Sequence, residues 1–430
     1  MLLTVLAKLG VRRTLVPAAV LLLSTCGRGA TPSRPDGDAT ADASGATSPA
    51  TFPVPDGGDC GGYASAIGGV CVCRSFWPLT CGGGCVNPQT NDFHCGACGH
   101  ACAAGATCNA GRCGPAPTVL QTAPVGSCGS VDVAVDGATL VWTDDAAGTV
   151  SRAPSAGGPP SVIASEEDHP RAVQLRGPRA FWLAGTLATG GADAATIRSA
   201  ALDGSAPASL VAPAGGVTGF VASPDGQTIY FGASGAVRGV ATTPGAQPVI
   251  VATDEQNGAL RAFALDGSAL MFHAYDASGT GAVEVVASVE GPQARCRASL
   301  EGGVWVGDLC ASIGQLLQGP TQLFSVAAAG AGYWPAASAL MMSSLTSGAI
   351  DRVALATFEA ANDVLALGAG GDELVISTVA GEIGKRPFAS APDVLGVRLA
   401  RDQKTPRSVA SDGARAYWST GDCQILSTPL

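Results

Sequence analysis

Residues 131–144 read VDVAVDGATLVWTD, and residues 408–420 read SVASDGARAYWST. In both stretches a short apolar segment ends at Asp-Gly, and a second segment that contains aromatic residues follows. Asp-Gly between two alternating segments is typical of the tight turn of a β-hairpin. Asp225-Gly226 and Asp266-Gly267 mark related stretches between these two. A recurring unit of strands and tight turns indicates a radial or solenoid β-architecture.

Each recurring unit resolves into four short strands. Alternating apolar residues and Gly-rich connections predict an antiparallel meander in each unit. In the first unit the expected strands span residues 131–135, 138–144, 149–153 and 160–164. Units two, three, four, six and seven begin near residues 172, 218, 260, 364 and 408. The fourth strand of unit four is hidden in an irregular stretch, and a degraded fifth unit spans 321–360, so the number of units is six or seven.

The last unit lacks its fourth strand. It has expected strands at 408–410, 416–419 and 425–428, and there the chain ends. An isolated segment at 118–123 has the pattern of a fourth strand and precedes the first unit. A propeller that completes its last blade with this segment would close the ring and remove an open sheet edge. We therefore predict an all-β fold, a seven-bladed or six-bladed β-propeller closed by an N-terminal strand.

Two blocks of the repeat carry aromatic residues in a recognisable order. Val-Trp-Thr-Asp at 141–144 and Tyr-Trp-Ser-Thr at 417–420 resemble the repeat motif of YWTD/NHL-like β-propellers. The resemblance covers most of residues 115–430 and implies the same blade architecture. We expect these aromatic side chains to pack between blades, and a ligand-binding stripe is the alternative.

The composition limits the possible partners. The chain has 430 residues and a formal net charge of −10, and charged residues make up only 13%. A chain this acidic repels phosphate backbones, so we expect no nucleic-acid partner. Fifteen cysteines are typical of an oxidising compartment, because a reducing cytosol keeps thiols unpaired.

The N-terminus resembles a bacterial export signal. Residues 1–25 combine three cationic residues with a short apolar segment that is too short to span a bilayer. Leu23-Ser24-Thr25-Cys26 resembles a lipobox, which implies lipidation of Cys26, although Thr25 replaces the small residue preferred there. Simple cleavage and an uncleaved anchor are the alternatives. Residues 26–58 lack the apolar residues of a core and predict a disordered linker after the lipobox cysteine.

Residues 59–114 form a cysteine-rich module. So little else could build a core that five disulfides would have to stabilise it. The spacing C-G-x-C-G-x-x-C resembles the cysteine-rich modules of plant stigma-specific proteins and of secreted myxobacterial proteins. That resemblance implies an exported bacterial protein but no activity. The ten cysteines are Cys60, Cys71, Cys73, Cys81, Cys85, Cys95, Cys98, Cys102, Cys108 and Cys113.

Two other interpretations of this module stay open. Cys95 and Cys98, with His94 and His100 nearby, have the spacing of a zinc knuckle. A Cys-x-x-Cys redox site is the second, although the βαβ context that it needs is absent. We favour structural disulfides and expect no metal and no cofactor. The connectivity of ten cysteines does not follow from sequence.

Four cysteines lie in the repeat domain, residues 115–430. Cys128 follows the orphan strand, and Cys423 lies in a turn of the last unit. In a closed propeller both positions emerge on the same face, so a Cys128–Cys423 disulfide is predicted as a latch on the ring. Cys296 and Cys310 remain and would pair with each other.

No catalytic motif is recognisable, and we predict no catalytic residue. Glu166-Glu167-Asp168-His169 is the densest polar cluster, and we interpret it as a solvated acidic loop rather than a divalent-cation site. We expect an exported lipoprotein of the outer membrane or cell surface, with a periplasmic or secreted protein as alternatives. It would be a monomer that contacts the membrane only through its lipid and serves as a non-enzymatic binding scaffold for a protein or glycan. A propeller-type hydrolase or lyase of the lactonase sort, with its site at the central channel, is the alternative.

Overall fold

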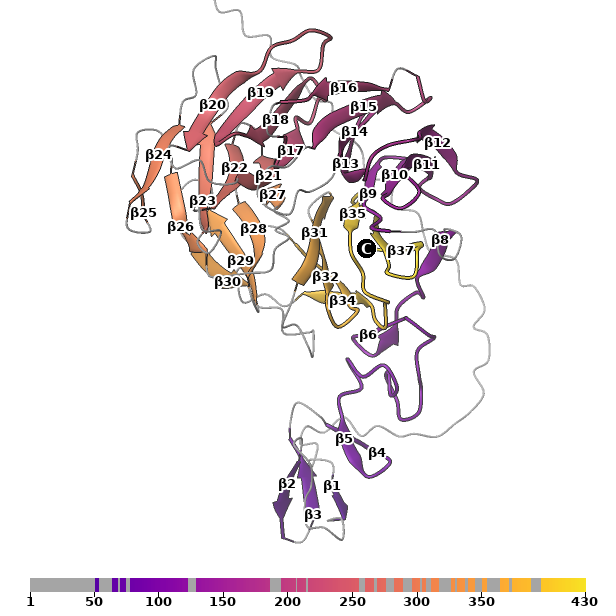
Figure 1. Cartoon of the computed structure of the whole chain (residues 1–430). Coiled ribbons are helices and arrows are strands. Elements are labelled where there is room, and N and C mark those ends of the chain that lie inside the picture. Colours follow the sequence, from indigo (N-terminus) through magenta and orange to yellow (C-terminus); the bar gives the residue numbers. More distant parts are fainter. Residues whose placement is uncertain are drawn as a thin grey trace, which may run out of the picture. The chain divides into compact units, whose positions relative to one another are not determined.

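The regular structure of the described residues consists of strands (Figure 1). The computed structural model describes residues 51–53, 64–68, 70–74, 78–122, 129–185, 195–205, 207–213, 216–254, 260–266, 269–275, 282–288, 296–301, 304–306, 311–316, 326–328, 331–336, 339–344, 350–353, 364–370, 373–387 and 396–430. The predicted signal peptide, Cys26, most of the predicted linker, Cys60, Cys128 and Cys310 lie outside them. Among the described residues there is no helix with the length and apolarity needed to cross a bilayer.

Seven antiparallel sheets, here called blades 1 to 7, follow one another through the described part of the chain (Figure 1). Within each blade we name the strands A to D from the inside outward. Blade 1 contains β9 (Val133–Asp136), β10 (Thr139–Asp144), β11 (Thr149–Pro154) and β12 (Ser161–Ala164). Blade 2 contains β13 (Arg171–Arg176), β14 (Arg179–Ala184), β15 (Thr196–Ala201) and β16 (Ala208–Val211). Blade 3 contains β17 (Gly219–Ala222), β18 (Thr228–Ala233), β19 (Ala236–Ala241) and β20 (Val249–Asp254).

The remaining four blades have the same strand order. Blade 4 contains β21 (Leu260–Asp266), β22 (Ala269–Tyr275), β23 (Ala282–Ser288) and β26 (Ala311–Leu316). Blade 5 contains β27 (Val326–Ala328), β28 (Ala331–Ala336), β29 (Ala339–Ser344) and β30 (Ile350–Val353). Blade 6 contains β31 (Val364–Gly370), β32 (Glu373–Thr378), β33 (Ile383–Pro387) and β34 (Val397–Ala400). Blade 7 contains β35 (Val409–Ser411), β36 (Arg415–Ser419), β37 (Gln424–Pro429) and β8 (Thr118–Thr122).

The ring is closed by the strand that precedes the first blade. Each innermost strand contacts the innermost strand of the next blade, and β35 of blade 7 contacts β9 of blade 1. Strand β8 pairs antiparallel with β37, with Gln424 opposite Thr122 and Ser427 opposite Thr118. Its register shifts between Ile425 and Leu426, as it does between Val150 and Ser151 where β12 joins blade 1. Strand β8 therefore occupies a regular fourth-strand position, which confirms the predicted propeller and sets the count at seven.

The hidden fourth strand of blade 4 has a structural explanation. A hairpin of β24 (Cys296–Glu301) and β25 (Val304–Val306) is inserted between the third and fourth strands of that blade. Strand β24 pairs parallel with β20 at the outer edge of blade 3, while β26 returns to blade 4. Because the insertion interrupts the four-strand period, sequence alone left the count open.

The core of the propeller lies between blades. Trp182 of blade 2 is fully buried among Val141 and Val150 of blade 1. Trp418 of blade 7 is fully buried against Val375 and Ile383 of blade 6. These aromatic side chains pack between neighbouring blades, as expected, and do not form an exposed binding stripe.

The cysteine-rich module consists of small sheets joined by disulfides. Strands β1 (Thr51–Pro53), β2 (Ala64–Ile67) and β3 (Val70–Cys73) form one sheet, and β4 (Leu79–Cys81) with β5 (Gly84–Val86) and β6 (Cys108–Asn109) with β7 (Arg112–Cys113) form two hairpins. The disulfides are Cys73–Cys85, Cys81–Cys98, Cys95–Cys108 and Cys102–Cys113. Strand β1 falls within the predicted linker, and Phe52 pairs with Cys71 in this sheet.

Candidate functional site

One face of the propeller carries the loops that join each blade to the next. In a four-stranded antiparallel meander, the B–C turns and the connections from strand D to the next strand A emerge on the same side. We call this side the D–A face. The inner strands begin there, so their first residues lie around the axis of the ring. The predicted acidic loop, residues 166–169, connects β12 to β13 on this face.

One carboxylate of the acidic loop is buried in the protein, and another is exposed to solvent. Glu167 is buried, and its carboxylate accepts hydrogen bonds from Arg198 Nη2 at 2.7 Å and from the Trp182 indole N–H at 2.9 Å. Asp168 is 69% exposed. The interpretation of the whole loop as solvated is therefore wrong at Glu167, because an indole and a guanidinium satisfy this buried carboxylate. Glu167 fastens the loop to blade 2.

The connection between blades 6 and 7 repeats this geometry. Gln403 Oε1 accepts the Trp418 indole N–H at 3.0 Å, and fifteen residues separate the partners in both loops. Each loop passes so close to the preceding B–C turn that a Cβ on Gly148 or Gly381 would collide with a backbone carbonyl. Both positions accordingly require glycine.

The left-handed residues of these loops also recur at matched positions. Glu166 and His169 have φ values of 58° and 45°, and Asp402 and Thr405 have φ values of 58° and 46°. Strained backbone can mark a functional residue. Here the same conformation is found in two loops with different side chains, so it belongs to the fold.

A polar cluster spans blades 7, 1 and 2 on the D–A face. We call it the D–A cluster, and it consists of Asp132, Asp145, His169, Arg171 and Arg407. His169 Nδ1 lies 2.6 Å from Asp145 Oδ1, which joins the loop before blade 2 to the B–C turn of blade 1. Gly129 lies against Asp145, since a Cβ on it would be 3.2 Å from Asp145 Oδ2. The Gly129 carbonyl accepts a hydrogen bond from Arg407 Nη1 at 3.3 Å.

Asp132 lies at the centre of the cluster. Its Oδ2 accepts the backbone N–H of Ala172 at 2.6 Å, which ties blade 1 to the inner strand of blade 2. Burial raises the pKa of Asp132, while the Ala172 hydrogen bond and the charges of Arg171 and Arg407 act to lower it and the charge of Asp145 to raise it. Both arginines thus act on the same carboxylate from opposite sides of blade 1. Arg171 Nη1 donates to the carbonyls of Gly185 and His169.

Sequence reasoning missed most of this cluster. The inner strands read as apolar, and of the five residues only His169 was singled out. A repeated signal was nevertheless present, because His169-Pro170-Arg171 and Thr405-Pro406-Arg407 place Pro-Arg at the same point of blades 2 and 7. The arrangement supplies an exposed guanidinium, an imidazole and carboxylates on one face, which is chemistry suited to hydrogen bonding and to charge recognition.

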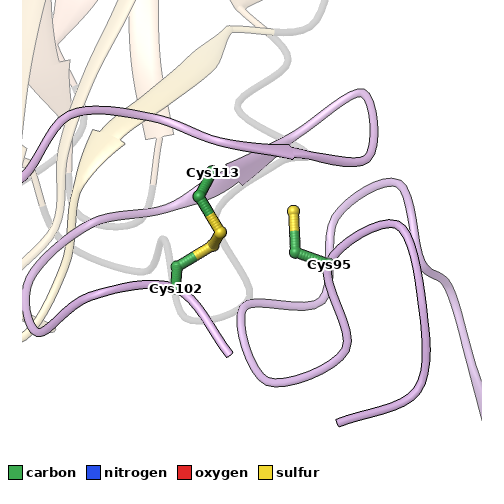
Figure 2. A group of neighbouring side chains, drawn as sticks. All are labelled: Cys95, Cys102 and Cys113. Carbon is green, nitrogen blue, oxygen red and sulfur yellow. A yellow bond between two sulfur atoms is a disulfide. The ribbon is translucent and has the colours of Figure 1, made fainter. Parts of the chain in front are cut away.

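The cysteine side chains are committed to disulfides. The sulfurs of Cys95, Cys102 and Cys113 lie within 4.8 Å of one another (Figure 2). Cys102 is bonded to Cys113, however, and Cys95 is bonded to Cys108. The zinc-knuckle pair is divided in the same way, because Cys98 is bonded to Cys81. These sulfur atoms are held in disulfides and are therefore not free thiolates for a metal ion.

Two further cysteines are disulfide-bonded. Cys71 and Cys423 are each half of a disulfide whose partner is outside the described residues. The pairing of Cys423 with Cys128 and that of Cys296 with Cys310 stay predictions. Only the backbone of Cys296, in β24, is described.

The module docks on blade 6 through a buried carboxylate. Asp92 of the module is 8% exposed and lies 2.7 Å from Arg398 Nη2 and 3.1 Å from Arg401 Nε. Arg398 also binds Glu382 of blade 6 at 3.1 Å. Thr107 Oγ1 donates to the Arg398 carbonyl at 2.8 Å, at the outer edge strand of the blade. The module and the propeller are therefore joined by a specific interface.

Comparisons with known proteins agree with the fold and go no further. No family model matches the chain, and no curated protein matches it. Among solved structures, catalytically inactive virginiamycin B lyase from Staphylococcus aureus with quinupristin aligns at 15% identity and a TM-score of 0.50, over 72% of this chain and 98% of that one. Kuenenia stuttgartiensis hydrazine synthase aligns at 12% identity and a TM-score of 0.51, over 72% and 97%. At such identities the similarity establishes a propeller-type fold alone.

Proposed function

We propose that this protein is a cell-envelope or surface lipoprotein whose propeller is a non-enzymatic binding scaffold for a protein or glycan ligand. Several disulfides indicate an extracellular or exported protein. The lipobox-like sequence at Cys26 supports a lipid anchor, followed by a spacer and two modules. The single observation that carries the binding role is the D–A cluster, in which side chains of three blades converge on one loop face of a closed ring.

The binding role is tested with a glycan array and a pull-down from envelope extracts. The wild-type protein is compared with the double variant His169→Asn and Arg407→Gln, which removes the exposed groups of the cluster. Asparagine tolerates the left-handed backbone at position 169. A matched control is Arg415→Gln, since Arg415 opens the second strand of blade 7 on the opposite face. We expect ligands that the control retains and the double variant loses. Identical ligand sets for all three proteins would contradict the proposal.

The alternative function is a hydrolase or lyase with its site on the same face. The observation that favours it is the His169–Asp145 pair, because a carboxylate that holds Nδ1 orients an imidazole for general base catalysis. Its test is a panel of lactones and esters, with metal analysis of the purified protein. Turnover that His169→Asn abolishes would establish this alternative in place of the scaffold.

The anchor and the latch are tested by peptide mapping. Mass spectrometry of the N-terminal peptide should find a diacylglyceryl group on Cys26, and Cys26→Ser should release the protein from membranes. A non-reducing digest should yield a Cys128–Cys423 peptide. On the entropic model, a crosslink over nearly three hundred residues contributes about 6 kcal/mol of stability. A Cys423 peptide joined to any other cysteine would exclude the latch.

A further inference from the structure

Arg407 is the solvent-exposed cation of the D–A cluster. Its backbone N–H donates to the Ser419 carbonyl at 3.0 Å, which fixes the start of the inner strand of blade 7. Its side chain makes one hydrogen bond to the described residues, from Nη1 to the Gly129 carbonyl. A guanidinium has five N–H donors in a planar fork that matches a carboxylate. The bond to Gly129 positions this fork on the D–A face without using most of its donors.

The two carboxylates of the D–A cluster are already engaged within the protein. Asp132 is half-buried and accepts the Ala172 amide, and Asp145 is bound to His169. Lys404, the lysine of the adjoining loop, is paired with Asp422 at 2.8 Å. Arg407 is thus left as the cation that can receive an acidic group from solvent. Because the chain carries a net charge of −10, an anion is attracted only at such a local site and not by the protein as a whole.

His169 adds a hydrogen-bond acceptor to this cation. The Asp145 carboxylate can only accept, so His169 Nδ1 donates the hydrogen bond between them. In the neutral imidazole of His169, Nε2 then carries the lone pair and is an acceptor. The side chain is 53% exposed, and the exposed carboxylate of Asp168 lies 3.9 Å from Nε2. An outward nitrogen lone pair and a neighbouring carboxylate both accept hydrogen bonds from hydroxyl groups. The site therefore offers the Arg407 guanidinium to a carboxylate, and His169 Nε2 and the Asp168 carboxylate to hydroxyl groups.

We propose that the D–A cluster binds a uronic acid unit of an acidic glycan, with Arg407 holding the carboxylate and His169 Nε2 accepting a hydrogen bond from a hydroxyl group. The inference rests on the proposed binding function and specifies its ligand. Arg171 is a positioning residue, because its bonds to the carbonyls of Gly185 and His169 hold the loop that presents the imidazole. A neutral sugar would leave the guanidinium without its anionic partner.

The test is calorimetric titration of the full chain with galacturonic acid and with an oligogalacturonate, against galactose as the neutral analogue. Arg407→Gln should weaken oligogalacturonate binding by about tenfold or more, the typical contribution of a hydrogen-bonded charge. Arg407→Lys keeps the charge but not the fork and should retain part of the affinity. His169→Asn should weaken binding while Arg415→Gln leaves it unchanged. Circular dichroism of each variant checks that the fold is intact.

The outcomes separate this inference from the proposed function. Binding of galactose as tight as that of galacturonic acid, or equal binding by Arg407→Gln and wild type, would overturn the assignment of the ligand. If the array finds another ligand that depends on His169 and Arg407, the scaffold stands and the uronate assignment falls. If no ligand depends on them, both fall.

Discussion

Substitution of Asp92 by asparagine tests whether the cysteine-rich module is docked by charge. The asparagine side chain would keep an oxygen for the Cys108 amide, which donates to Asp92 Oδ1 at 2.6 Å. It would replace the anionic oxygen that faces Arg398 at 2.7 Å and Arg401 at 3.1 Å. Removing one partner of a buried ion pair typically costs about 3–5 kcal/mol. Arg398 retains Glu382, so we expect about 3 kcal/mol, on the order of 100-fold in the docking equilibrium.

Hydrogen exchange measures this loss at the interface itself. The Arg401 amide donates to the Gly105 carbonyl of the module at 3.2 Å, so undocking should accelerate its exchange. Urea unfolding of the full chain supplies the global stability. Asp402→Asn is the matched control, since Asp402 also binds Arg401 but is 69% exposed, and surface pairs contribute about 0–1 kcal/mol. If Asp92→Asn and the control have the same exchange rate at Arg401, the charge-based account of docking is wrong.

The remaining predictions concern the closure and the repeated contacts of the propeller. Leu120 of β8 packs on the core between blades 7 and 1, so Leu120→Ala should lower the free energy of unfolding in urea by about 1–2 kcal/mol. Val119→Ala, at an exposed site of the same strand, should change it by less than about 0.5 kcal/mol. Equal effects of the two substitutions would argue against closure by β8. Gln403→Leu leaves the buried Trp418 indole N–H unpaired and should cost about 1–3 kcal/mol, and a double-mutant cycle with Trp418→Phe should recover most of that loss. Burial and a hydrogen bond to a carboxylate raise the pKa of Tyr417 to about 12, so its neutral form is favoured in the folded protein. Its stabilisation is therefore complete below pH 10 and is lost as the pH rises toward 12, and stability should fall more steeply there in wild type than in Tyr417→Phe.

The aspartate of the Asp-Gly turn in blade 7 explains why the repeat can be recognised in the sequence. Asp412 Oδ1 accepts the backbone N–H groups of Ala414 and Arg415 at 2.9 and 2.8 Å, and its Oδ2 accepts the Tyr417 hydroxyl at 2.7 Å. The turn and the aromatic residue of the following strand are thus joined within six residues. Contacts this local leave a pattern in sequence. The strands of blades 1 and 7 begin and end within two residues of their predicted bounds, and blades 2 and 3 begin within one residue of their predicted starts.

The closing strand was also predictable, for a different reason. The last unit has three expected strands, and an orphan strand precedes the first unit. Pairing the orphan strand with the last unit leaves no unpaired sheet edge, which would be unfavourable. The pairing of β8 with β37 follows from counting strands. Counting strands did not predict the inserted hairpin of β24 and β25. Strand β24 pairs parallel with β20 of the preceding blade, and no repeat in the local sequence indicates this pairing.

The amino-acid sequence by itself therefore determined the strands and turns of the regular blades and the closed ring, because alternating side chains and turn residues act over a few positions. The tertiary structure alone decided the partners of Glu167, the disulfide connectivity of the module and its docking through Asp92. It also decided the D–A cluster, in which the charge of Arg407 acts on Asp132 only because the ring brings blades 7 and 1 together. Charges and sulfurs act on whatever lies within a few ångströms in space, and no spacing along the chain encodes such neighbours.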